Sequence, residues 1–222
     1  MKLLSVSVAL PRETVWHGHV VISGISKSPV KGRIALRRLN LDGDRQADLS
    51  VHGGKDKAVY CYPVEHYAYW KEQLPGRDLP PGSFGENFTV DGLLEHSVCI
   101  GDSFSIGSAE VVVTQPRMPC YKLGMKFEDD HMVKRFLASG RTGFYFAVTR
   151  EGEVGAGDEI TMIGRDSHTV TVADVTRLYI AKSFSDDDAT LVQKALAAPA
   201  LPQSWKSYLQ ARLGAHGASA TG

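Results

Sequence analysis

The sequence predicts a mainly β domain followed by a small C-terminal unit of three short helices. Up to about residue 165, short runs rich in β-branched and aromatic residues are broken by glycines, which is typical of strands joined by tight turns. After residue 168, apolar residues recur at helical spacing in three segments. With 222 residues, the chain is long enough to bury a sizeable core in one large domain with an appendage. We assign residues 1–165 to the β domain, 166–214 to the helices and 215–222 to a disordered tail.

The N-terminal run MKLLSVSVAL predicts a half-buried strand, because Leu4, Val6, Val8 and Leu10 alternate with other residues. It is too short and too interrupted by serines for a signal peptide, and no small-x-small cleavage site follows it. Farther along, FSIGSAEVVVT (104–114) predicts a hairpin that turns at Gly107. GFYFAVT (143–149) and DEITMI (158–163) predict two more strands that pair across the polar segment 150–157.

Two helices are expected within the β domain. KAVYCY (57–62) predicts a strand, and Pro63 suits the first position of a helix that carries Tyr67, Trp70 and Leu74 on adjoining turns. EDDHMVKRFLASG (128–140) predicts a short helix that ends at Gly140, since acidic residues stand in its first turn and basic residues later.

The C-terminal helices have clear start signals. Thr171-x-x-Asp174 and Ser185-x-x-Asp188 are both capping-box patterns. A third helix follows Pro199, with Gly214 as its expected stop. These helices hold few basic residues, so they do not form the basic stripe that nucleic-acid binding requires.

Composition narrows the function. Lys+Arg and Asp+Glu balance at 25 each, so no overall field attracts nucleic acid or an acidic membrane. The three cysteines stand far apart and include no CxxC pair. We therefore expect a protein of the reducing cytoplasm with neither nucleic acid nor a membrane as partner.

Three polar stretches are candidate binding loops, and a solvated loop is the alternative for each. The segment 43–60 concentrates opposite charges around two glycines, whose backbone can approach an anion closely. Its charged residues are Asp44, Arg45, Asp48, His52, Lys55, Asp56 and Lys57, and Asp48, His52, Gly53, Gly54 and Lys55 are its candidate site residues. The segment 26–33 supplies phosphate donors in Lys27, Ser28 and Lys31. The turn 82–90 offers Glu86 and Asn87 to a heterocycle, or they only close the turn.

The stretch TQPRMPCYKL (114–123) is the most suggestive. Cys120 follows a proline and stands between Arg117 and Lys122, and nearby cations favour the thiolate that attacks or binds a metal. Thr114 and Gln115 add hydrogen-bonding groups. Cys61 and Cys99 stand in apolar runs that favour buried, inert thiols. The residues favour a functional Cys120, either nucleophile or ligand to a soft metal, whereas no companions for a zinc site stand at usable spacing.

Three blocks of this sequence resemble those of MOSC-domain proteins of the YiiM type. They are GDRQADLSVHGGKDKAVYCYPVEHY, PGSFGENFTVDGLLEHSVCIGD and VTQPRMPCYKL, in matching order and spacing. The resemblance covers residues 1–165, and the helical tail is similar to the appendage of YiiM-type proteins. It implies a MOSC-type β-barrel and a molybdenum–molybdopterin cofactor, with Cys120 as the thiolate ligand of the metal.

The resemblance also implies an activity, the reduction of N-hydroxylated purines and related compounds to amines with electrons from a separate flavoprotein reductase. The chain would then bind and orient the cofactor. The residues that would do so are Lys27, Ser28, Lys31, His52, Gly53, Gly54, Lys55, Asn87, Thr114, Gln115, Arg117 and Cys120. His52 is the expected proton donor by residue type, with Asp48 or Glu86 as alternatives. The rival functions are a sulfur carrier with a persulfide on Cys120 and a non-enzymatic binding module.

Overall fold

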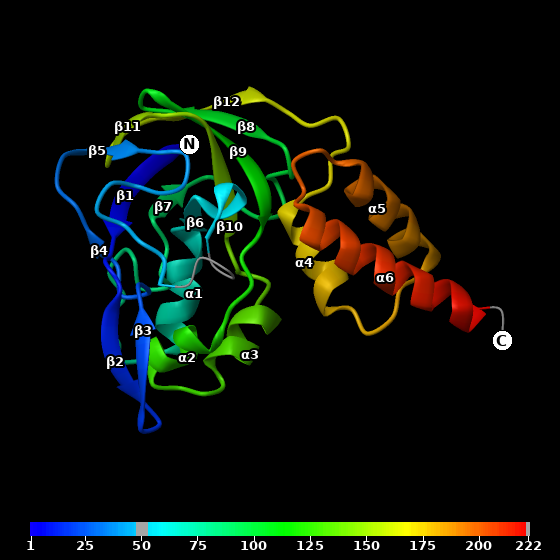
Figure 1. The fold of residues 1–222 in the computed structure, drawn as a ribbon, viewed down its shortest axis with the longest axis horizontal. Helices are drawn as coiled ribbons and strands as arrows, with labels where there is room; N and C mark the ends of the chain where they lie inside the picture. The colour runs from blue at the N-terminus through cyan, green and yellow to red at the C-terminus, as the bar shows by residue number, and fades with distance from the viewer. Residues whose placement is uncertain (48–52, 221–222) are drawn as a thin grey trace.

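The computed structural model describes residues 1–47 and 53–220, with side chains described up to residue 215. One strongly curved sheet of eight strands forms the body of the protein, and the three C-terminal helices, α4 to α6, lie together beside it (Figure 1). The strand order is β12-β8-β9-β10-β6-β7-β1-β4. All neighbours are antiparallel except β6 and β7, which are parallel.

The sheet strands are β1 (Lys2–Val8), β4 (Ser28–Pro29), β6 (Val59–Pro63), β7 (Phe88–Asp91), β8 (Ser103–Ile106), β9 (Ala109–Pro116), β10 (Phe144–Arg150) and β12 (Ile160–Gly164). Two ribbons complete the β structure: β2 (Arg12–Trp16) with β3 (His19–Ser23), and β5 (Arg33–Leu36) with β11 (Gly152–Gly155). The predicted mainly β fold with a helical C-terminal region is confirmed. Near the two ends of the strand order, β1 and the chain just before β12 meet at a short seam, where Lys2 forms an antiparallel bridge with Glu159.

The predicted hairpin at Gly107 is confirmed by β8 and β9. Gly107 has φ 58°, and a Cβ there would lie 2.3 Å from the carbonyl oxygen of Glu153, so only glycine fits. β10 and β12 are confirmed as strands, but the prediction that they pair with each other is wrong. β10 lies between β6 and β9, and β12 pairs with β8. The segment between them forms β11, which pairs with β5 and lets the chain cross to the far edge of the sheet.

The predicted alternation in β1 is wrong in part. Leu3 is fully buried and Leu4 is 40% exposed, the reverse of the expected pattern, whereas Val6 is buried as expected. The register against β7 shifts between Leu3 and Ser5, and such a bulge moves the side chains before it to the other face of the sheet. Leu10 lies beyond the strand and is exposed.

A second, largely aromatic core lies between the sheet and the helices α1 (Glu65–Gln73), α2 (Tyr121–Phe127) and α3 (Met132–Ala138). The predicted buried face of α1 is confirmed, since Tyr67, Trp70 and Leu74 are all buried. Pro63 ends β6 and does not open the helix. The Trp70 ring stacks on Phe136 with centroids 5.4 Å apart, so α1 and α3 share this core.

The C-terminal helices are α4 (Val172–Ile180), α5 (Asp186–Ala197) and α6 (Gln203–Ala220). Both predicted capping boxes are confirmed at Thr171 and Ser185. The expected stop at Gly214 is wrong, because α6 continues to Ala220. Gly214 does not take the left-handed conformation that ends a helix. Among the described residues, no helix combines the length and apolar character needed to cross a membrane.

Candidate functional site

A pocket opens where the segment after β3, residues 44–47, β6, β10 and the β9–α2 connection meet. The space between its walls is about 660 Å³, a volume that includes open solvent. Its described lining is Ser23, Gly24, Ile25, Lys27, Asp44, Arg45, Gln46, Ala47, Lys57, Tyr60, Gly85, Asn87, Arg117, Met118, Cys120, Lys122 and Tyr145. Five lysines and arginines stand against one acid in this set, so the wall is locally basic in a chain of zero net charge.

Cys120 lies in the pocket wall, half-buried, at the residue that precedes α2. Arg117, Met118 and Lys122 of the same stretch line the same pocket. The other two cysteines differ as predicted. Cys61 and Cys99 are 0% and 4% exposed, and burial raises the pKa of both thiols. Cys120 is thus the one cysteine that a pocket ligand can reach.

Arg117 is the most unusual residue of the site. Its side chain is buried, with the guanidinium carbon 5.2 Å from the ring centroids of both Tyr60 and Phe136. Among the described residues, its Nη1 atom has no hydrogen-bond partner. An unsatisfied buried donor costs free energy unless a bound group accepts its proton, and an anion is the best acceptor for a guanidinium.

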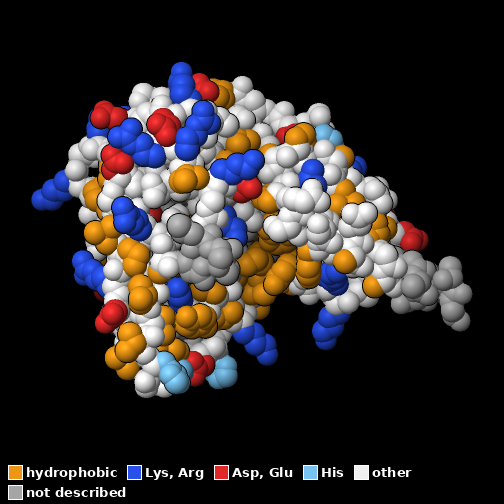
Figure 2. Space-filling model, in the orientation of Figure 1, with side chains coloured by type: hydrophobic (Ala, Val, Ile, Leu, Met, Phe, Trp, Pro, Cys, Tyr) orange, Lys and Arg blue, Asp and Glu red, His pale blue; other side chains and the backbone are white. Residues whose placement is uncertain are grey.

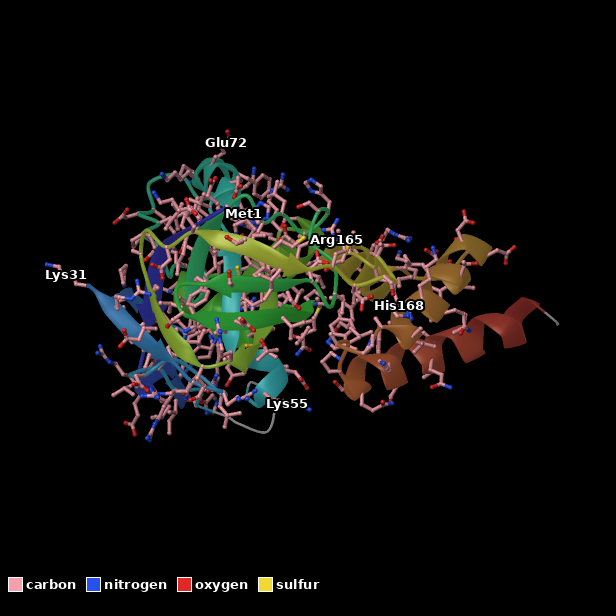
Figure 3. All side chains as sticks on the ribbon, turned by 90° about the horizontal axis from the view of Figure 1, so that it is seen from above. Met1, Lys31, Lys55, Glu72, Arg165 and His168 are labelled. Carbon is pink, nitrogen blue, oxygen red and sulfur yellow. The ribbon has the colours of Figure 1, made fainter. Side chains whose placement is uncertain are left out.

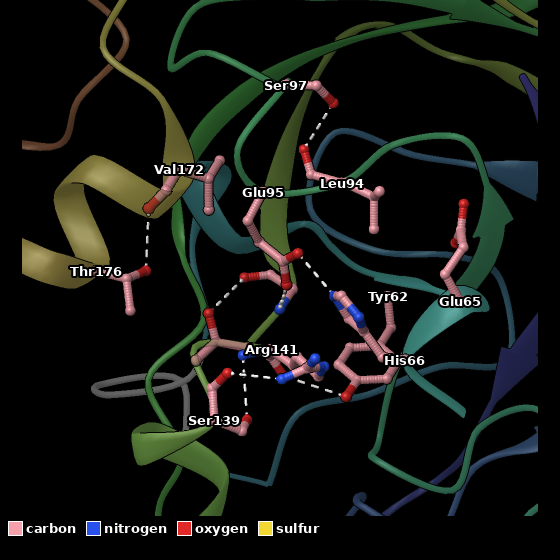
Figure 4. A network of polar contacts seen from close by, with 12 residues as sticks. Tyr62, Glu65, His66, Leu94, Glu95, Ser97, Ser139, Arg141, Val172 and Thr176 are labelled. Atoms are coloured by element: carbon pink, nitrogen blue, oxygen red, sulfur yellow. Dashed lines mark hydrogen bonds and ion pairs between the residues drawn. The ribbon is translucent and has the colours of Figure 1, made fainter. Parts of the chain in front are cut away.

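The backbone beneath Arg117 is held by a second layer of buried groups. The Arg117 N–H donates to the Gly143 carbonyl at 3.1 Å, and the Gly143 N–H donates to Glu95 Oε1 at 2.7 Å. The other oxygen of Glu95 lies 2.7 Å from His66 Nε2, as Figure 4 shows. Tyr62 donates its hydroxyl to the Arg141 carbonyl at 3.1 Å. These contacts fix the direction in which Arg117 enters the pocket.

Lys27 lies in the pocket as predicted, but its ammonium group forms an ion pair with the buried Asp44. Burial lowers the pKa of Lys27, and Asp44 opposes that effect. Asn87 also lines the pocket, and its amide is used internally. It donates to Asp44 Oδ2 at 3.0 Å and to the Ser7 carbonyl, and it accepts from the Tyr60 N–H. Lys27 and Asn87 therefore build the wall more than they offer donors to a ligand.

Several other predicted residues do not line the pocket. Ser28 and Lys31 are exposed, and Lys31 points away from the body of the protein (Figure 3). Lys55 is exposed and lies at the surface in the same view. Gly53 and Gly54 do not line the pocket either. Gly54, with φ 97°, is the residue before the 3-10 helix Lys55–Lys57.

Thr114 and Gln115 are buried behind the pocket and make internal hydrogen bonds. Glu86 is fully buried and accepts from the Gly82 and Phe84 N–H groups, from Thr89 and from Tyr67, so it closes its own turn and does not reach the pocket. Asp48 and His52 lie outside the described residues.

Sequence reasoning did not select Lys57, Lys122, Tyr60 and Tyr145 as site residues. Burial lowers the pKa of Lys57, and it raises the pKa of Tyr145. Tyr60 and Tyr145 come from β6 and β10, which pair in the sheet, so only the strand pairing could have placed them together. For Lys57 and Lys122 a signal was present, since each stands within a stretch that the sequence analysis had already singled out.

The donor set fits an anionic group that brings its own metal ligands. The described residues hold no cluster of three or more His, Cys, Asp or Glu side chains that could bind a metal ion. A thiolate at Cys120 suits a soft metal whose other ligands come from a non-protein group. The unpartnered Nη1 of Arg117 and the basic wall suit the negative charge of such a group.

Comparison with known proteins identifies the class. Residues 48–161 match the MOSC domain, and residues 170–215 match the YiiM-like 3-alpha helix domain. The chain belongs to the MOSC-domain family.

Within that family the chain is similar to proteins of the YiiM type. It is 41% identical to YflK of Bacillus subtilis over 92% of this chain and 91% of that protein. It is 37% identical to YiiM of Escherichia coli over 86% of this chain and 84% of that protein. The crystal structure of YiiM from Geobacillus stearothermophilus has a TM-score of 0.78 and 33% identity, and the match covers 96% of this chain and 98% of that one.

A Gibberella moniliformis protein named reductase is 33% identical over 76% of this chain, which spans 30% of that longer protein.

Proposed function

We propose that this protein is a molybdopterin-dependent oxidoreductase that reduces N-hydroxylated compounds, such as N-hydroxylated purine bases, to amines. The observation that carries the proposal is that one basic pocket is lined by both Cys120 and Arg117, whose Nη1 atom has no hydrogen-bond partner among the described residues. Membership of the MOSC family and the reductase of Gibberella moniliformis support an oxidoreductase.

The residues of the pocket divide the work. Cys120 would ligate the metal through its sulfur, because a thiolate suits a soft metal. Arg117, Lys57 and Lys122 would bind the anionic part of the cofactor, and Tyr60 and Tyr145 would form a firm wall around it. When bound, the cofactor supplies two electrons and an acceptor for the oxygen that leaves the N–OH group. The chain's own task is binding, orientation and proton supply.

His52 and Asp48 remain the proposed proton donors by residue type, since Glu86 is buried behind its own turn. We propose a separate flavoprotein reductase as the electron donor. Three scattered cysteines cannot supply the four thiolates that an iron–sulfur cluster usually takes.

The test is expression in a host that makes molybdopterin, followed by metal analysis and reduction of 6-hydroxylaminopurine with a reduced dye. We expect about one molybdenum per chain, and loss of metal and turnover in a folded Cys120→Ala variant. Cys61→Ala is the matched control, because Cys61 is sealed in the core and should keep both. Full activity in Cys120→Ala would refute the mechanism. Cyanide-releasable sulfur without metal would indicate a sulfur carrier, and neither product would indicate a binding module.

A further inference from the structure

A buried hydrogen bond joins the C-terminal helices to β9, the strand whose residues Thr114 and Gln115 lie behind the pocket. Trp205 of α6 is 8% exposed, and its indole N–H donates to Gln115 Oε1 at 2.7 Å. Gln115, in β9, is 3% exposed. Figure 2 shows hydrophobic side chains gathered along the boundary between the β-rich body and the helices, so water competes little for this bond.

From Gln115 the network continues to the other side of the pocket. Gln115 Nε2 donates to the Asp56 carbonyl at 3.1 Å, and Thr114 Oγ1 donates to the same oxygen at 2.7 Å. A carbonyl oxygen has two lone pairs, and these two hydrogen bonds use both lone pairs of the Asp56 carbonyl. Asp56 lies in the 3-10 helix that ends at Lys57, a residue of the pocket wall. The position of Lys57 thus depends on two side chains of β9.

The same two residues set the course of the chain toward Cys120. In the ladder with β10, Tyr145 faces Gln115 and Phe146 faces Val113, so Thr114 is the extra residue of a β-bulge. A bulge bends its strand and redirects the residues that follow. Pro116 and Pro119 then fix φ at two positions before Cys120, so a change at the bulge is transmitted along a stiff segment.

We infer that Trp205 is a positioning residue for the pocket. By holding Gln115, it fixes the bulge that directs Cys120 and, through the Asp56 carbonyl, the 3-10 helix that presents Lys57. The helical unit is therefore a structural part of the site. The inference rests on the proposed function only in naming the cofactor that the pocket would hold.

Trp205→Phe tests this inference, because phenylalanine keeps an aromatic ring at the boundary between the β-rich body and the helices and leaves Gln115 Oε1 without its donor. Tyr208→Phe is the matched control. Its ring belongs to the same aromatic cluster, and its hydroxyl makes only a 3.4 Å bond to the Tyr179 carbonyl. Thr114→Val is the second variant, since it removes the other bond to the Asp56 carbonyl, together with the 3.1 Å contact to the Tyr145 carbonyl, and keeps the shape of the side chain.

Two readouts apply. The first is the rate of molybdenum loss during dialysis of the loaded protein, which should rise about tenfold in Trp205→Phe. The second is the labelling rate of Cys120 by a thiol reagent in native, cofactor-free protein, with Cys120→Ala as the blank. We expect labelling at least threefold faster in Trp205→Phe and in Thr114→Val, and within twofold of wild type in Tyr208→Phe.

A Trp205→Phe protein that matches Tyr208→Phe in labelling overturns the inference, even if its thermal stability has fallen. If the wild-type protein takes up no molybdenum, the proposed function fails, and the labelling rates still decide whether Trp205 positions the pocket.

Discussion

Arg117→Met should weaken cofactor binding while it leaves the cofactor-free protein about as stable as before. Methionine fills the same space between the rings of Tyr60 and Phe136 and carries no charge. The variant removes a donor that has no partner among the described residues, so the folded chain loses no hydrogen bond at Nη1.

The magnitudes follow from these contacts. Relief of one unsatisfied buried donor is worth about 1–3 kcal/mol. Loss of two cation–π contacts costs about 0.5–2 kcal/mol each, and loss of the side-chain hydrogen bond between Arg117 and Tyr145 costs about 0.5–1.5 kcal/mol more. The gain and the losses therefore offset each other in the unfolding free energy to within about 2 kcal/mol. A hydrogen bond to a charged group contributes about 1.5–3 kcal/mol to a complex, which predicts cofactor affinity about 10- to 150-fold weaker.

Arg165→Met is the matched control. Arg165 donates to the fully buried Asp102 at 2.8 Å, and its side chain is 47% exposed. We expect this variant to lose about 2 kcal/mol, less than for a fully buried pair because solvent screens the arginine, and to retain molybdenum normally. Urea unfolding of cofactor-free protein and metal content after dialysis measure both effects. If Arg117→Met loses several kcal/mol and retains its metal, Arg117 is a structural residue and the reasoning is wrong.

Three further predictions concern the packing around the site. Burial lowers the pKa of Lys126 from 10.5 to about 8. The unfolded state then binds more protons between pH 8 and 10.5, so this lysine makes stability rise with pH there by up to about 3 kcal/mol, and Lys126→Met should flatten the measured slope. Gly143→Ala should cost at least about 3 kcal/mol in urea unfolding, because a Cβ would lie 2.4 Å from a carbonyl oxygen of β6. Gly140→Ala, at nearly the same φ but in open space, should cost only about 1 kcal/mol, and equal losses would count against the steric reason. Lys27→Met should cost about 3 kcal/mol by leaving the buried Asp44 without its cation, and a loss below 1 kcal/mol would show that the ion pair contributes little.

Local chemistry made parts of the fold predictable from the sequence. Thr171 and Ser185 cap their helices through side chains only three residues from their partners, and Gly107 turns a hairpin within a few residues. Strand pairing was less accessible. The second predicted hairpin failed because a short ribbon strand lies between β10 and β12, and its partner β5 is more than a hundred residues away in the sequence.

In the candidate site, too, residues that stand close together in the sequence were predictable, and residues brought together by strand pairing were not. Cys120 and Arg117 were found because they stand together in one unusual stretch. Ser28 and Lys31 were grouped with Lys27 by proximity in the sequence, although both are exposed and neither lines the pocket. Tyr145 reaches the pocket through strand pairing. The unpartnered nitrogen of Arg117 is a property of packing, and no residue pattern reveals it.

The seam between Lys2 and Glu159 has a consequence for biosynthesis. Because Met1 and Leu3 hydrogen-bond to Ile160 and Asp158, the first strand finds its last neighbours only after nearly the whole β domain has left the ribosome. Contacts of such long sequence separation are formed late and slowly. The nascent chain therefore exposes this flank of β1 until residues 158–160 have been synthesised.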